Sequence, residues 1–216
     1  MRWLLLLGSL SACAASYDRK ADPHALTVFM RESGWCWYQG PRAIVQGDQL
    51  FIGAVRGNGS GAAQVGVYDL SARKPLGAVV MQDKFDHDDH NSPVFYARPD
   101  GSVLAIYARH NRDKAHYYRI AAAGDPLNWS EEMRFTHDYS AAGNVTYMNL
   151  YYLAQESTLY NFFRGIQFNP SFIRSADHGK TWGQPTHFIA SELNGRPRPY
   201  ARYARCGCRQ RACELY

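Results

Sequence analysis

The sequence predicts an all-β fold that forms part of a β-propeller, and three observations support this prediction. Glycine, proline and tyrosine are plentiful, with 18, 10 and 15 copies in 216 residues, as is typical of chains with many short strands and turns. Segments with a strand–turn–strand pattern recur with a period of 52 and then 56 residues, a spacing typical of propeller blades. Residues 175–182 also match a turn motif found in repeated hairpins.

Composition and charge exclude several classes of protein. With 46% hydrophobic and 20% charged residues, the chain is neither disordered, nor collagen-like, nor a coiled coil. No apolar run reaches the length of a membrane-spanning helix. The formal charge of +5 suits an anionic partner but is equally common in ordinary basic proteins. Since the sequence has no nucleic-acid-binding motif and no basic stripe, we expect no nucleic-acid partner.

Residues 1–20 are predicted to be a signal peptide. Arg2 supplies a positive charge, and residues 3–10 form an apolar stretch that is too short to span a bilayer. Residues 10–13 resemble a bacterial lipobox, in which Cys13 becomes lipidated; ordinary cleavage near the same position is the alternative. We therefore predict an extracytoplasmic protein, either secreted or a lipoprotein that contacts the membrane only through its lipid.

Three repeated segments are predicted to form the inner hairpins of three blades. They cover residues 41–56, 93–109 and 149–164, and each consists of a strand, a tight polar turn and a second strand that ends in arginine. A fourth repeat begins at residues 199–204. An antiparallel sandwich with coincidental hairpins is the alternative, but it does not explain the regular period. The partial propeller should therefore span residues 21–204 and hold about three and a half blades.

The turn motif at residues 175–182 fits the Asp-box pattern Ser-x-Asp-x-Gly-x-Thr-Trp. Asp177 should cap the turn, Gly179 should adopt a positive φ, and Trp182 should pack beneath the hairpin. The motif supports the repeat fold but carries little information on function, because such turns lie away from the functional face.

Residues 205–216 break the repeat pattern. They contain three of the five cysteines and show no alternation of polar and apolar residues, and the cysteine spacing does not match a zinc knuckle. We expect an aberrant tail caused by truncation or a frameshift, with a genuine short extension as the alternative. Because closed propellers need about four to eight blades, the chain alone is expected to have low stability.

An aromatic run at residues 34–38 is predicted to be strand-like. We expect Cys36 to be a small buried side chain rather than a metal ligand or a disulfide partner. Trp35, Trp37 and Tyr38 are predicted to be packing residues of the first blade, with a sugar-stacking surface as the alternative.

Polar residues occur at equivalent places in neighbouring blades. His90 precedes the first strand of the second blade, and Tyr147 occupies the same place in the third. His110 and Arg164 follow equivalent second strands, so the repeat predicts that these side chains converge. We predict His90 and Tyr147 as catalytic residues and the following as substrate-binding residues: His110, Arg164, Arg109 and Asn91.

Tyrosine, histidine and arginine together suit β-elimination at a uronate. Arginine, helped by histidine, would neutralise the carboxylate beside the C5 proton and stabilise an enolate-like transition state. A base then removes that proton and an acid protonates the glycosidic oxygen. With a reference pKa of about 10, tyrosine can act as the acid unaided, and as a base only beside cations. The chemistry requires no cofactor, although residues 87–90 could alternatively hold a structural calcium or zinc ion.

Motifs that carry a family resemblance lie at residues 34–39, 41–44, 89–93, 108–111, 146–149, 162–165 and 198–200. Together they resemble the BNR-repeat proteins that include the propeller ulvan lyases, the twenty-fourth and twenty-fifth polysaccharide lyase families. The resemblance covers residues 30–204 and implies a seven-bladed propeller that cleaves a sulfated, uronate-containing algal polysaccharide. It also implies that His90 is the base and that Tyr147 is the acid, and for one uronate epimer also the base. Arg164 and His110 would neutralise the substrate carboxylate.

Two other functions fit the same fold. A sialidase-like or other glycoside hydrolase would need two carboxylates roughly 5–9 Å apart, or a tyrosine nucleophile with an acidic partner and an arginine cluster. The sequence offers Asp88, Asp89, Arg56, Arg109 and Arg164 for these roles, but the carboxylates share one loop. A non-catalytic carbohydrate-binding lipoprotein is the third possibility. We favour the lyase because no pair of acids on neighbouring blades is visible.

Overall fold

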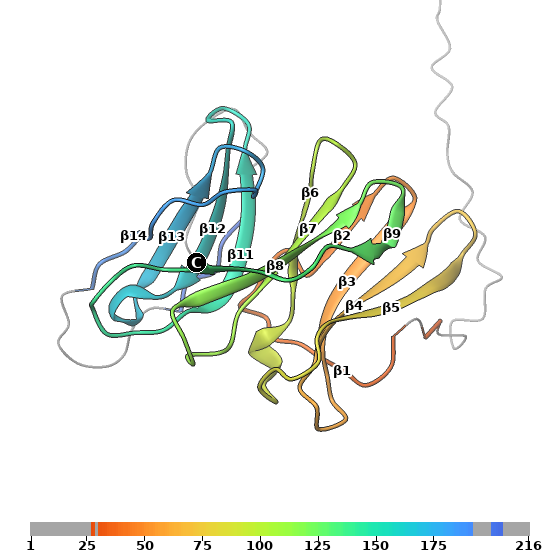
Figure 1. Cartoon of the computed structure of the whole chain (residues 1–216), viewed down its shortest axis with the longest axis horizontal. Helices are drawn as coiled ribbons and strands as arrows, with labels where there is room; N and C mark the ends of the chain where they lie inside the picture. Colours follow the sequence, from red (N-terminus) through yellow and green to blue (C-terminus); the bar gives the residue numbers. More distant parts are fainter. Residues whose placement is uncertain (1–26, 29, 192–199, 205–216) are drawn as a thin grey trace, which may run out of the picture.

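The computed structural model describes residues 27–28, 30–191 and 200–204, which form three antiparallel sheets arranged side by side as successive blades (Figure 1). The described part contains no α-helix, only two short 3-10 turns, η1 (Asp89–Asn91) and η2 (Ile166–Phe168). Within the same ranges no helix is long and apolar enough to cross a membrane. The predicted signal peptide, with Cys13, and the tail at 205–216 lie outside the described residues, so both remain predictions.

Each blade is an antiparallel meander that begins with a predicted hairpin. The first sheet pairs β2, β3, β4 and β5 in order, and β1 adds to one end of β3. The second pairs β6, β7, β8 and β10, with β9 beside the end of β8. The third pairs β11, β12, β13 and β14. The bounds are β1 Ser33–Gly34, β2 Ala43–Gln46, β3 Gln49–Arg56, β4 Ala63–Asp69, β5 Lys74–Gln82, β6 Val94–Ala97, β7 Val103–Tyr107, β8 Ala115–Ala122, β9 Asp125–Trp129, β10 Met133–Thr136, β11 Thr146–Leu153, β12 Thr158–Arg164, β13 Pro170–Ser175 and β14 Thr186–His187.

The prediction of repeated hairpins is confirmed for three blades. The strand pairs β2–β3, β6–β7 and β11–β12 coincide with the three repeated segments read from the sequence. The fourth start is different, because residues 200–204 are not part of any strand in the described ranges. The Tyr203 carbonyl instead accepts a hydrogen bond from the Tyr151 hydroxyl at 2.8 Å, which holds this segment against the third blade.

The middle blade is buried on both faces, and this explains its sequence. Successive side chains of a strand point to opposite faces, yet all five residues of β7 are buried. Val103, Ala105 and Tyr107 belong to a core shared with the first blade, and Leu104 and Ile106 to a core shared with the third. Burial of both faces accounts for the continuous apolar run in place of alternation.

Close backbone contact joins the first two blades at Gly53. A Cβ atom added there would lie 2.1 Å from the carbonyl oxygen of Pro93, so no larger residue fits without moving one of the two blades. Gly53 donates its N–H to the Arg42 carbonyl, and the Phe95 N–H donates to the Pro41 carbonyl. The segment that enters β2 therefore contacts both blades.

The Asp-box forms the turn that its sequence predicts. Asp177 Oδ1 accepts hydrogen bonds from the Ser175 hydroxyl at 2.7 Å and from the Thr181 N–H at 2.9 Å. Gly179 has a φ of +84°, a conformation that glycine adopts without strain. Trp182 is buried in the core between the second and third blades. The predicted roles of Asp177, Gly179 and Trp182 are thus confirmed.

The aromatic run at 34–38 is not a strand beyond Gly34, so that prediction is wrong. The chain turns at residues 37–38 and then pairs with the third blade, where the Leu150 N–H donates to the Gly40 carbonyl at 2.8 Å. Its backbone therefore bonds across to β11 instead of extending the first sheet. Cys36 is buried and free, as predicted.

Two buried histidines should make the fold sensitive to acid. His116 and His137 are almost fully buried, and their facing ring nitrogens lie 3.1 Å apart. Burial lowers both pKa values; it lowers that of His137 to about 3 and that of His116 well below its usual value, and His137 lowers the latter further. The unfolded chain titrates near its usual value of about 6.5. It therefore binds more protons than the folded chain below that pH.

We expect the free energy of unfolding to fall as the pH drops from about 6.5 towards 3, by up to about 1.4 kcal/mol per pH unit for each histidine. Urea unfolding at a series of pH values measures this slope. In a His116→Gln/His137→Gln double variant the slope over this range should be much smaller. His87→Gln, at an exposed histidine, is the control. An unchanged slope in the double variant would rule out the buried pair as the cause.

Candidate functional site

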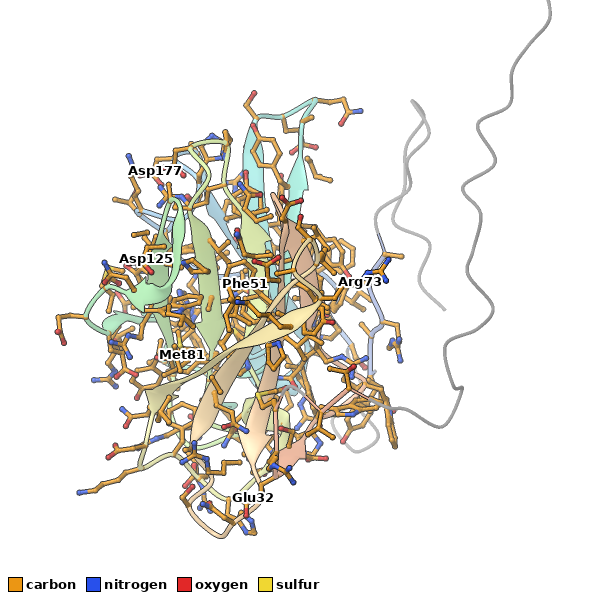
Figure 2. The ribbon with its side chains drawn as sticks, turned by 90° about the vertical axis from the view of Figure 1, so that its right-hand side faces the viewer. Glu32, Phe51, Arg73, Met81, Asp125 and Asp177 are labelled. Atoms are coloured by element: carbon orange, nitrogen blue, oxygen red, sulfur yellow. The ribbon has the colours of Figure 1, made fainter. Side chains whose placement is uncertain are left out.

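The candidate site lies at one end of the blades. Figure 2 shows Glu32 and Asp177 at opposite ends of the molecule. The Asp-box turn therefore lies at the end of the blades opposite the loop that carries Glu32. Gly34, at the end of that loop, lies close to Asp89: a Cβ added to it would be 3.7 Å from the Asp89 Cβ. The loop between β5 and β6, which carries the candidate residues 87–91, is therefore at the Glu32 end.

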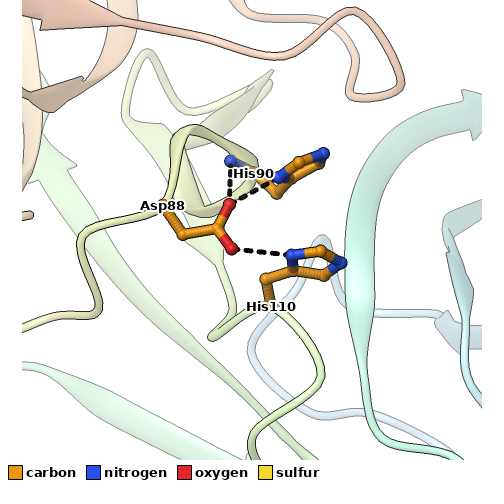
Figure 3. A group of neighbouring side chains, drawn as sticks. All are labelled: Asp88, His90 and His110. Atoms are coloured by element: carbon orange, nitrogen blue, oxygen red, sulfur yellow. Dashed lines mark hydrogen bonds and ion pairs between the residues drawn. The ribbon is translucent and has the colours of Figure 1, made fainter.

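One carboxylate holds the two candidate histidines together (Figure 3). Asp88 Oδ1 lies 2.5 Å from His90 Nδ1, and its Oδ2 lies 2.7 Å from His110 Nδ1. The ring centroids are 4.2 Å apart. Asp88 also caps the turn η1 by accepting the His90 N–H at 3.0 Å, a role that aspartate fills well. Local turn chemistry therefore places this carboxylate between two histidines from different loops.

The hydrogen bonds determine the protonation of this cluster. Partial burial opposes ionisation of Asp88, but hydrogen bonds from the His90 backbone and from the rings of His110 and His90 outweigh it and lower its pKa. An ionised carboxylate only accepts, so both Nδ1 atoms must carry the proton. The two Nε2 atoms remain on the side of the rings that faces away from Asp88 (Figure 3). Each is an acceptor when its ring is neutral and a donor when it is charged.

Two buried amides fix the loops that carry these histidines. Asn91 Oδ1 accepts the His110 N–H at 2.7 Å, and its Nδ2 donates to the Asp86 carbonyl at 3.0 Å. Gln39 Nε2 donates to the carbonyls of His90 and Ser92 at 2.6 and 3.1 Å. The His90 and His110 loops are thus fixed relative to each other.

Tyr147 contacts both histidine rings from the third blade. Its ring centroid lies 5.2 Å from that of His90 and 5.5 Å from that of His110. The pairing of β11 with β12 is irregular at this point, and Tyr147 has a φ of +63°, which is rare for an aromatic residue and costs about 1–3 kcal/mol. Asn149 Nδ2 donates to the Tyr147 carbonyl at 2.6 Å, and so supports this strained backbone.

The environment of Tyr147 keeps its hydroxyl protonated. Burial raises its pKa well above the usual value, more than the charge of Arg164 lowers it, and Tyr200 and Cys36 raise it further. A neutral phenol can donate a proton, whereas a phenolate base would need a lower pKa. A raised pKa is therefore compatible with the acid role expected for Tyr147 and opposes the base role.

Arg164 completes the cluster with a charge that forms no ion pair with a carboxylate in the described part of the chain. It ends β12 opposite Thr146, next to Tyr147. Its guanidinium carbon lies 5.2 Å from the ring centroid of Tyr147 and 5.0 Å from that of Tyr200. Its buried Nε has no hydrogen-bond partner within the described ranges. A buried donor left unmatched is costly, so this atom is suited to an anionic ligand.

Two of the predicted substrate-binding residues do not face this cluster. The Arg109 guanidinium lies over the Phe85 ring, 5.4 Å from its centroid. The ring of the next residue, His110, instead bonds through Nδ1 to Asp88, so the two adjacent side chains have different partners. Asn91 is completely buried with both ends of its amide bonded. It therefore positions His110 rather than touching substrate.

The alternative metal site at residues 87–90 takes a different form. Ligand atoms of Asp88, His90 and His110 lie within 4.8 Å of one another, whereas His87 is exposed and is not part of this group. A carboxylate that bonds to Nδ1 of a metal-binding histidine is a common outer-shell arrangement. The two Nε2 atoms could therefore accept a zinc ion with Asp88 behind them.

Two tyrosines of the site, Tyr38 and Tyr200, were not predicted from the sequence, and Asp88 was predicted only as a hydrolase carboxylate or metal ligand, not as the group that holds both histidines. The Tyr38 ring contacts those of Tyr147 and Tyr200 at tilted angles, with ring centroids 5.5 and 5.2 Å apart. These tyrosines come from distant parts of the chain, and the repeat does not relate them. Asp88 could have been recognised, because its spacing from His90 is typical of a capped turn.

The fold and the site together define a repeat-built β-propeller protein with a polar cluster formed by loops of neighbouring blades. The chain belongs to the family described as "BNR repeat-containing family member", which matches residues 36–212. No curated protein sequence matches the chain.

Solved structures share the fold. An ulvan lyase, described as a new family of polysaccharide lyase, PL25, has a TM-score of 0.54 and 15% sequence identity, and the match covers 73% of this chain and 39% of the lyase. A second structure, of a PL25 ulvan lyase bound to -[GlcA(1-4)Rha3S]-, matches with a TM-score of 0.55 and with the same identity and coverage. An exo-beta-1,3-galactanase from Phanerochaete chrysosporium has a TM-score of 0.46 and 8% identity, and the match covers 69% of this chain and 35% of the galactanase. The chain thus spans about two fifths of the lyases' length.

Proposed function

We propose that the protein is a polysaccharide lyase that cleaves a uronate-containing, ulvan-like anionic polysaccharide by β-elimination. The observation that carries this proposal is that His90, His110, Tyr147 and Arg164 meet from two neighbouring blades, and that the buried Arg164 Nε has no hydrogen-bond partner among the described residues. These are the groups that elimination requires: a base, an acid and cations that neutralise a carboxylate.

Each group has a role in this proposal. Arg164 and one protonated histidine bind the uronate carboxylate, which makes the C5 proton more acidic. The other histidine, neutral at Nε2, removes that proton; we assign this role to His90. Tyr147 protonates the leaving glycosidic oxygen as a C4–C5 double bond forms.

The geometry of the carboxylates gives less support to a glycoside hydrolase. Asp88 is committed to both histidines, and Asp89 lies beside it with its Oδ1 3.0 Å from His90 Nδ1. The two acids lie on one side of the site, rather than on opposite sides of a substrate bond. Of the expected arginine cluster, Arg56 bonds to Gln64 and Arg109 lies on Phe85. A tyrosine-nucleophile hydrolase would also need the pKa of Tyr147 to be lowered.

The proposed location is outside the cytoplasm, because the pattern of residues 1–20 is that of an export signal. A lipid on Cys13 would then be the only contact with a membrane. Such a location would give the protein access to an extracellular polysaccharide.

Product analysis tests the proposal. The purified chain is incubated with a uronate-containing sulfated polysaccharide, and both ultraviolet absorbance and reducing ends are followed. Elimination produces an unsaturated uronate, so the two signals should rise together. Reducing ends without absorbance would indicate a hydrolase, and neither signal would indicate a binding protein.

We expect elimination to need no metal ion, because Arg164 and a histidine supply the positive charge. Dialysis against a chelator should leave kcat and KM within about twofold of the untreated protein, a difference of less than about 0.5 kcal/mol. If activity were lost and then restored by zinc or calcium, His90 and His110 would be metal ligands, and their assignment as base and cation would be wrong.

A further inference from the structure

A second cavity lies beside the candidate site. It has a volume of about 440 Å³, within the range of about 300–1,000 Å³ typical of small-molecule sites. Its lining combines aromatic, cationic and polar side chains from the segment before β2, from β11 and from the 200–204 segment; the main ones are Trp35, Trp37, Arg42, Asn149, Arg202 and Tyr203. None of these is among the predicted catalytic or substrate-binding residues.

Two arginines in this cavity pair with no acidic side chain that the structure describes. Arg42 and Arg202 both line it, and neither forms an ion pair with a carboxylate in the described ranges. Burial lowers the pKa of Arg42, and the neighbouring charge of Arg202 lowers it further. A pair of like charges in one cavity is unfavourable unless an anion binds between or beside them.

Arg42 is also oriented for such an anion. Its guanidinium carbon lies 4.0 Å from the centroid of the Trp35 ring. This cation–π contact holds the guanidinium against the face of the indole. The N–H groups lie in the plane of the guanidinium and so remain available for a bidentate contact with a carboxylate or sulfate.

Trp37 offers an exposed aromatic face in the same cavity. It is 58% exposed and Trp35 is 51% exposed, which contradicts the prediction that both pack within the first blade. The segment turns towards the third blade after Cys36 and so leaves these rings uncovered. An exposed indole beside cations is suited to stack against the apolar face of a sugar ring.

We infer that this cavity is a second subsite that binds one anionic sugar residue, with Trp37 stacking on the ring and Arg42 and Arg202 binding its carboxylate or sulfate. The inference rests on the proposed function, since it places a further unit of the same polysaccharide. Tyr203 lines both this cavity and the one beside Tyr147, and Trp37 contacts Tyr38, with ring centroids 6.1 Å apart. One chain could therefore occupy both.

Binding and turnover are measured separately to test this subsite. Tryptophan fluorescence and calorimetry follow titration with three oligosaccharides of equal length: a uronate, a sulfated neutral sugar and an uncharged sugar. Arg42→Gln should weaken binding of the charged ligands about tenfold and leave the uncharged one unchanged. Trp37→Ala should weaken all three by a similar factor. Arg73→Gln, which removes an exposed charge outside the cavity, is the matched control.

The results distinguish the subsite from the reaction. If the wild-type protein eliminates polysaccharide and both variants keep its KM and affinities, the subsite is wrong and the lyase stands. If Arg42→Gln loses affinity selectively for charged ligands while no unsaturated product forms, the subsite stands and the lyase is wrong. Whichever charged oligosaccharide, the uronate or the sulfated one, loses more affinity in Arg42→Gln identifies the anion that the subsite binds. The inference would be overturned if the wild-type protein bound no saccharide, or if this face were instead occupied by a second copy of the chain.

Discussion

Replacing Tyr147 with phenylalanine is expected to lower kcat for elimination by about 10²–10⁴-fold, the usual contribution of a general acid. The change removes one hydroxyl and retains the ring that contacts His90, His110 and Arg164. KM should change little, because substrate binding depends on the arginine and the histidines. Initial rates of unsaturated product, measured by absorbance, give both constants.

Tyr160→Phe is the matched control. Tyr160 lies in the same sheet, but its hydroxyl bonds to the exposed Glu156, and we expect wild-type rates. The free energy of unfolding of Tyr147→Phe should stay close to that of the wild type, because the strained φ at this position is unchanged. Full activity of Tyr147→Phe would contradict the role of this tyrosine as the acid.

The Asp88→Asn variant is expected to lose about as much, 10²–10⁴-fold in kcat, although Asp88 is a positioning residue. The oxygen of the new amide can accept a hydrogen bond from one histidine, but its nitrogen can only donate to the other. That second histidine would have to accept the hydrogen bond at Nδ1, and its own proton would then lie on Nε2. That ring could no longer take a proton from substrate. The loss of negative charge would also disfavour the imidazolium that neutralises the carboxylate.

Asparagine also caps turns well, so η1 should remain folded and the defect should lie in chemistry. The pH profile distinguishes the two causes: a tautomer defect shifts or removes its histidine limb, whereas local unfolding lowers the rate at every pH. Asp83→Asn, at an exposed carboxylate of the same loop, should behave like the wild type. An unaltered pH profile in Asp88→Asn would exclude the positioning role.

Much of the fold follows from local sequence, and the reason is the repeat. Polar turns such as the one at Gly47 fix the hairpins, and the Asp-box encodes its own hydrogen bonds through Ser175 and Asp177. The apolar run of β7 encodes burial on both faces. Each of these features depends on residues within about ten positions of one another, so pattern alone identifies them.

The site was predictable only where the repeat relates its residues. His90 and Tyr147 occupy equivalent places and do meet. Arg109 was misplaced because the sequence does not show which of two adjacent residues points inward at the end of a strand. Tyr38 and Tyr200 were missed because their contact depends on a segment that crosses from the first blade to the third. Such a path is set by tertiary contacts and has no local signal.

The most direct test of the account is the position of a bound substrate. A crystal structure of the Tyr147→Phe variant with a uronate oligosaccharide should show a uronate carboxylate against Arg164 Nε and one histidine. The C5 atom should lie within reach of His90 Nε2, and the glycosidic oxygen should face the ring at position 147. An oligosaccharide ordered elsewhere on the blades, with Arg164 still unpaired, would contradict the assignment of this cluster as the active site.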